Sequence, residues 1–180
     1  MKSRIIYLLS FVALFAFYSC DEDLLDVTEE FYYSSEITVL SNDTLTTVNE
    51  VVDMSSESSI INDYKDKIET IEITEVKYWI TQHTGDSLQE IIEATLNIAD
   101  ADGANETLIA TIEDKVLNSI IGEDNAQELV IQQAGVNQMA NLIKNEPNTF
   151  QINYHTACNE APLNFTVKFQ FKVKMVANPL

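Results

Sequence analysis

The feature that most constrains the fold is a strictly alternating run near the C-terminus, from Leu163 to Met175. Every odd-numbered position in this run is apolar and every even-numbered position is polar, three of them lysine. Successive side chains of a β-strand point to opposite faces of the sheet. The run therefore predicts an antiparallel strand with one face on a core and the other in water. Phe169, in the middle of the apolar face, should be among the most buried residues.

Shorter alternating runs predict six or seven further strands, and apolar residues at helical spacing predict two short helices. One helix is expected over residues 60–67. The other is expected around Val136, ending before Pro147. The predicted strands cover residues 36–40, 44–54, 70–82, 92–98, 108–112, 129–131 and 150–154.

Two of these strands carry local detail. In segment 70–82 the apolar residues change parity between Ile73 and Val76, which predicts a β-bulge, because one extra residue reverses the facing. Strands 92–98 and 108–112 flank an Asp-Gly pair at positions 102–103, which favours a hairpin. Residues 113–121 fit the end of a strand or a helical turn.

A mostly β domain is the simplest reading of this pattern. We expect an immunoglobulin-like antiparallel β-sandwich with one or two short helices, formed by residues 36–180 as a single domain. A single curved sheet covered by the Val136 helix is the alternative.

The N-terminus has the features of an export signal. Lys2 and Arg4 precede an almost unbroken apolar run over residues 5–17, and Ser19 stands directly before Cys20. A run of this length is too short to span a bilayer as a helix. The order resembles a bacterial lipoprotein signal, and the following Asp21, Glu22 and Asp23 resemble the surface-export signal of Bacteroidetes lipoproteins.

That resemblance implies a signal peptide over residues 1–19 and a lipidated acidic tether over residues 20–35, with lipid on the Cys20 thiol. It implies an outer-membrane, surface-exposed protein that contacts the membrane through its N-terminal lipid.

The chain is strongly acidic, with a formal net charge of −19 and a pI near 4.1. This charge argues against a nucleic-acid partner, which requires basic patches. The acidity is better explained by solubility than by cation binding. We expect no cofactor.

One acidic segment nevertheless resembles a calcium loop in composition. Asp100, Asp102, Asn105 and Glu106 place oxygen ligands around Gly103, and calcium takes six to eight such ligands. The spacing matches no EF-hand, so a solvated hairpin turn is the preferred interpretation.

The residues for nucleophilic or zinc chemistry are sparse. His83 and His155 lie in unrelated segments, and with Cys20 lipidated Cys158 is the remaining thiol. His155 and Cys158 are three positions apart, so in a strand they face opposite sides of the sheet. Two distant histidines and one cysteine also make a poor zinc site.

Three further features bear on glycans. Asp43-Thr44-Leu45 and Asp86-Ser87-Leu88 resemble the O-glycosylation motif of Bacteroidetes exported proteins. Trp79, the sole tryptophan, has the parity of a wet face. It could stack on a sugar or contact a second layer.

These observations lead to a functional prediction. We expect a non-enzymatic cell-envelope or surface lipoprotein whose β-sandwich is a binding or adhesion-type module with an unknown protein or glycan partner. The alternative is an envelope carrier of an apolar ligand held between sheet and helix. A carbohydrate-active enzyme, whose carboxylate pair would be assembled across strands, is a more distant third.

Overall fold

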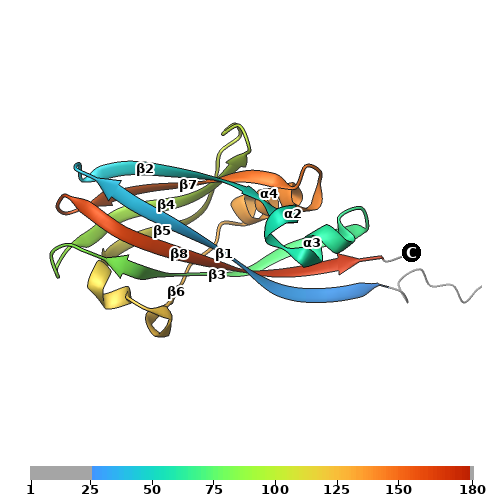
Figure 1. Cartoon of the computed structure of the whole chain (residues 1–180), viewed down its shortest axis with the longest axis horizontal. Helices are drawn as coiled ribbons and strands as arrows, with labels where there is room; N and C mark the ends of the chain where they lie inside the picture. Colours follow the sequence, from blue (N-terminus) through green and yellow to red (C-terminus); the bar gives the residue numbers. More distant parts are fainter. Residues whose placement is uncertain (1–25, 179–180) are drawn as a thin grey trace, which may run out of the picture.

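The computed structural model describes residues 26–178 and consists of two antiparallel four-stranded sheets packed face to face (Figure 1). Sheet A has the strand order β1-β8-β3-β6, and sheet B has the order β2-β7-β4-β5. The strands are β1 (Val27–Ser41), β2 (Leu45–Asp53), β3 (Ile68–His83), β4 (Glu90–Asp100), β5 (Thr107–Val116), β6 (Gln127–Glu128), β7 (Thr149–Cys158) and β8 (Leu163–Ala177). The predicted antiparallel β-sandwich is confirmed.

The strand order differs from the immunoglobulin-like order that we expected. β1 pairs with β8, β2 with β7, β3 with β6 and β4 with β5. The chain therefore folds as one long hairpin of four strand pairs, and alternate pairs fall in different sheets. This is the arrangement of an eight-stranded, double-sheet jelly roll, whereas an immunoglobulin domain divides its strands as ABED and CFG.

β8, the strand predicted from alternation, is an inner strand of sheet A. It pairs with β1 on one side and β3 on the other, and each of its odd-numbered residues is buried. The polar face is neutralised across strands, because Lys168 lies 3.2 Å from Glu36 and Lys172 lies 3.1 Å from Glu30. Two of the three lysines of this run are thus paired with glutamates on the outer surface.

β1 begins earlier than the predicted domain boundary. Residues 27–35, which we had assigned to a tether, are strand and pair with β8. Tyr33 is buried, with its ring 5.8 Å from that of Phe171 and 6.4 Å from that of Phe150. The tether prediction is corrected for this stretch, because its inward positions pack on the core despite the acidic composition.

The predicted bulge in β3 is confirmed. The register with β8 shifts between Ile73 and Glu75, where the parity of the apolar residues changes. Trp79 lies on the outward parity yet is only 4% exposed, and Lys168 Nζ lies 5.7 Å from its ring centre. The indole is therefore covered rather than displayed as a sugar platform.

The helices differ in extent from those predicted. Two short helices, α2 (Met54–Glu57) and α3 (Ser59–Tyr64), replace the single helix expected over residues 60–67. The split falls at Ser58, whose side chain accepts a hydrogen bond from the Ile61 amide and caps α3. Residues 117–120 form the 3₁₀ turn η2 (Leu117–Ile120), followed by η3 (Glu123–Asn125).

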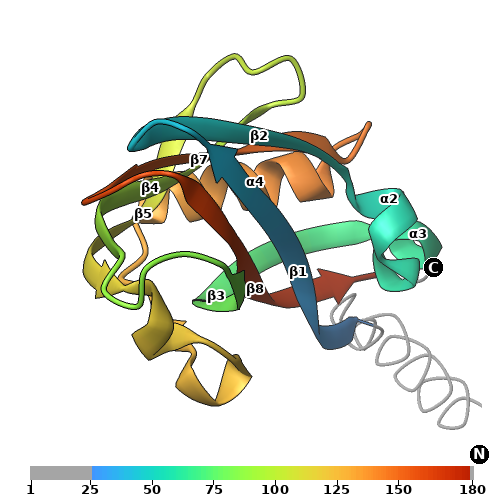
Figure 2. The same cartoon turned by 60° about the vertical axis from the view of Figure 1, so that its left-hand side comes forward.

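Helix α4 (Gln133–Lys144) lies between the two sheets rather than outside them (Figure 2). It contacts β3 of sheet A and β4, β5 and β7 of sheet B. Its apolar stripe, predicted from Val136, Met139, Ala140 and Ile143, is buried. The helix is thus part of the core.

The two ends of the described chain lie together, since Val27 is the register partner of Ala177. The β1–β2 turn and the β7–β8 loop lie at the opposite end of the sandwich (Figure 1). Within residues 26–178, no helix has the length and apolar character needed to cross a bilayer.

Candidate functional site

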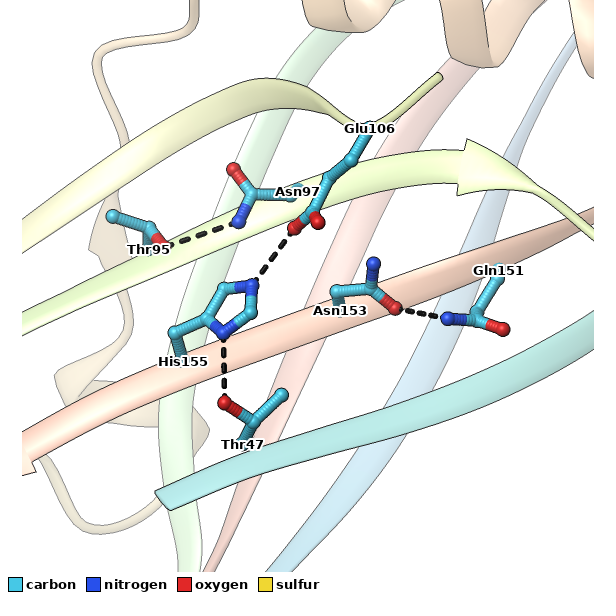
Figure 3. Close-up of polar contacts among 7 residues, drawn as sticks. All are labelled: Thr47, Thr95, Asn97, Glu106, Gln151, Asn153 and His155. Atoms are coloured by element: carbon cyan, nitrogen blue, oxygen red, sulfur yellow. Dashed lines mark hydrogen bonds and ion pairs between the residues drawn. The ribbon is translucent and has the colours of Figure 1, made fainter. Parts of the chain in front are cut away.

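The outer face of sheet B carries a cluster of polar side chains (Figure 3). The strand register places them in cross-strand rows, with Thr47, His155 and Thr95 in one row. A neighbouring row joins three asparagines. This polar cluster consists of Thr47, Asn49, Thr95, Asn97, Gln151, Asn153 and His155.

Glu106, from the loop between β4 and β5, reaches over this cluster. Its Oε1 lies 2.8 Å from His155 Nε2, and His155 Nδ1 lies 2.8 Å from Thr47 Oγ1. The imidazole therefore joins the edge strand β2 to the β4–β5 loop. This contact crosses three elements that are distant in sequence.

The carboxylate of Glu106 is held in its charged form. The hydrogen bond from His155 is the largest cause that lowers the pKa of Glu106, and partial burial opposes it. Side-chain hydrogen bonds from Asn153 and Asn97 lower the pKa further. Donors on His155, Asn153 and Asn97 are thus engaged by a residue of the same chain, so the cluster acts as a latch for the loop.

This latch predicts an acid-sensitive contribution to stability. A carboxyl whose folded-state pKa lies below its usual value of 4.5 stabilises the fold above that value. The contribution is lost as the pH falls through the lower, folded-state pKa. The urea midpoint of the wild type should therefore fall more steeply than that of Glu106→Gln between about pH 6 and about pH 3.

Glu93→Gln is the matched control, because Glu93 is exposed on the same face of sheet B. It should retain the acid dependence of the wild type. Equal slopes for the wild type and Glu106→Gln would show that the latch does not contribute.

The predicted calcium residues are not gathered around a common point. Asp100 Oδ2 accepts a hydrogen bond of 2.6 Å from Asn105 Nδ2, and Asp102 Oδ1 accepts one of 3.0 Å from the Ala104 amide. The Glu106 carboxylate is turned toward His155. Across residues 26–178, His, Cys, Asp and Glu side chains form no group of three or more able to hold a metal ion.

His83 and Cys158 have structural positions. His83 is hydrogen-bonded to Asn118 at 2.8 Å and to Gln89 at 2.9 Å, which fixes the β3–β4 loop against η2. Cys158 is buried, and burial raises the pKa of its thiol. The expected opposite facing of Cys158 and His155 is confirmed, so they form no nucleophile–base pair.

Both glycosylation motifs that the sequence contains lie in exposed turns, and their modification stays a prediction. A shallow hollow of about 230 Å³ lies beside the polar cluster, where Ala157 leaves space between Leu45, Glu93 and His155.

β2 is the free edge of sheet B, and sequence reasoning did not identify it. The Cys158 amide donates to the Thr44 carbonyl at 2.8 Å, so even-numbered residues of β2 direct their backbone groups toward β7. Odd-numbered residues then direct theirs outward. Within residues 26–178, no strand pairs with this outer side of β2.

The edge has few of the features that usually prevent pairing, with Glu50 and Asp53 as its charged residues. Residues 45–53 contain no lysine and no proline, and their register with β7 shows no bulge. Natural edge strands are commonly blunted by such features. The edge of β5 differs, because the Gln132 amide donates to the Ile109 carbonyl there.

The strand order defines the chain as a jelly-roll β-sandwich with an open edge at β2. No protein family and no curated protein matches the sequence. Several solved structures that resemble it are viral. One is Desmodium yellow mottle tymovirus, with 16% identity and a TM-score of 0.32 over 86% of this chain and 90% of that chain. Another is the decameric BFDV capsid protein, with 10% identity and a TM-score of 0.38 over 83% of this chain and 98% of that chain. Tobacco necrosis virus is a further example, with 8% identity and a TM-score of 0.33 over 84% of this chain and 96% of that chain.

These comparisons contradict the functional predictions made from sequence, because the matched structures are those of two viruses and of the BFDV capsid protein. The surface lipoprotein with a binding or adhesion module, the alternative carrier, the lipid-anchored membrane contact and the outer-membrane location are withdrawn. Similarity at this level does not transfer a capsid function to the chain either. Cys20, Asp21, Glu22 and Asp23 lie outside the described residues, so the signal resemblance stays a prediction.

Proposed function

We propose that the protein is a structural, non-enzymatic subunit that functions by associating with further copies of itself. The observation that carries the proposal is the open edge of β2, whose outward backbone groups pair with no strand within residues 26–178 and can pair with a strand of another copy. The polar cluster on the same sheet supports it, because Glu106 already engages the donors that a substrate would need.

Charge sets the conditions for this association. The formal net charge of −19 makes copies of the chain repel one another. Added salt screens such repulsion. Association should therefore be weak at low ionic strength and stronger at moderate ionic strength.

Sedimentation of the purified full chain tests the proposal. The weight-average mass should rise with protein concentration from the micromolar to the millimolar range, and the rise should be larger in added sodium chloride. A single monomeric species at every concentration and salt level would overturn the proposed function.

A further inference from the structure

The outer edge of β2 has a self-complementary order of residues. We infer that two copies pair through β2 in antiparallel fashion, about a two-fold axis beside Val48. Leu45 of one copy then lies opposite Val51 of the other, and the two B sheets become one eight-stranded sheet. This inference rests on the proposed function and specifies its contact.

The backbone limits the possible registers. The outward backbone groups belong to Leu45, Thr47, Asn49 and Val51. In an antiparallel pair, opposite residues exchange both hydrogen bonds. An axis beside Val48 places Leu45 opposite Val51 and Thr47 opposite Asn49. Each of the four residues then lies opposite another residue whose backbone groups point outward.

The side chains favour this register over its neighbour. Leu45 is 71% exposed and Val51 is 61% exposed, and both lie on the outer face of sheet B. The inferred register brings them together twice across the axis, and apolar cross-strand pairs stabilise sheets. An axis at Asn49 would instead place Leu45 opposite Asp53.

The charge distribution also suits a second copy. Glu50 is the one charged residue from Leu45 to Val52, and it accepts a 2.5 Å hydrogen bond from Ser35 Oγ. In the inferred register Glu50 lies opposite Thr46, so no like charges meet within this segment. The segment from Leu45 to Val52 thus carries a single charge on a chain whose net charge is −19. β1, an edge strand of sheet A, carries three glutamates.

The edge is held in a pairing-competent shape. The register of β2 with β7 is unbroken over all nine residues, and His155 fixes the Thr47 side chain at 2.8 Å. A nine-residue edge is smaller than a standard stable interface. The dimer should therefore be weak and concentration-dependent.

Charge complementation tests the register on the full chain. Leu45→Lys and Val51→Glu should each weaken self-association by about tenfold or more. Mixing the two variants should restore it, because the introduced lysine then faces the introduced glutamate while the second Leu–Val contact remains. Sedimentation of each variant and of the equimolar mixture gives the comparison.

Val130→Lys and Val130→Glu are matched controls, because Val130 is 84% exposed and follows β6 in the chain rather than lying on β2. They should associate as the wild type does, and circular dichroism should show all four variants folded. If Leu45→Lys and Val51→Glu each associated as strongly as the wild type, the β2 contact would be overturned while the proposed function would stand. Weakened single variants without restoration in the mixture would overturn the register.

Discussion

Replacing Phe169 with alanine should lower the free energy of unfolding by roughly 3–5 kcal/mol. The side chain is fully buried at the middle of β8. Its ring lies 5.5 Å from the ring of Tyr154 in sheet B and 6.3 Å from that of Tyr78 in sheet A. Truncation removes an aromatic that joins the two sheets and leaves a cavity between them.

Urea unfolding followed by circular dichroism measures this loss. Gln170→Ala, the next residue on β8, is the matched control because its side chain lies on the half-exposed outer face. It should change the unfolding free energy by about 0.5 kcal/mol or less. A loss below about 1 kcal/mol for Phe169→Ala would mean that the core is not packed as described.

Gly135→Ala should be comparably damaging, by roughly 3 kcal/mol or more. An added Cβ would lie 2.2 Å from the Leu108 carbonyl oxygen and 2.8 Å from Ile109 Cα. Both are backbone atoms of β5, so no side chain can move aside. Helix α4 would have to shift away from β5, which loosens the burial of Val136 and Met139.

The sign of this effect is diagnostic. In an open helix, replacing glycine with alanine stabilises by about 1 kcal/mol. Asn137→Ala, on the exposed side of α4, should be neutral or slightly stabilising in the same urea titration. A stabilised Gly135→Ala variant would contradict the close approach of α4 to β5.

Local patterns predicted a large part of the fold. The alternation of β8, the parity change in β3 and the Asp-Gly hairpin between β4 and β5 each depend on residues within a short window. The boundaries of strands and helices were harder to predict. Glu29 and Glu30 interrupt the apolar pattern at the start of β1, and the polar residues around Ser58 hide the cap that begins α3.

Strand order was not predictable in the same way. β1 pairs with β8 and β2 with β7, and no local pattern records which distant strands meet. The edge position of β2 follows only from that order. The latch was missed for the same reason, because Glu106 and His155 are 49 positions apart. Glu106 had been considered as a calcium ligand from its own loop, without its actual partner.

The position of β8 between β1 and β3 has a consequence for biosynthesis. A ribosome makes β1 and β3 well before it makes the strand that hydrogen-bonds to both of them. Until residues 163–177 emerge, Tyr33 and Tyr78 lack the phenylalanine rings on which they stack. Sheet A is therefore completed only when synthesis has passed its central strand, and the nascent chain must keep two apolar strand faces apart until then.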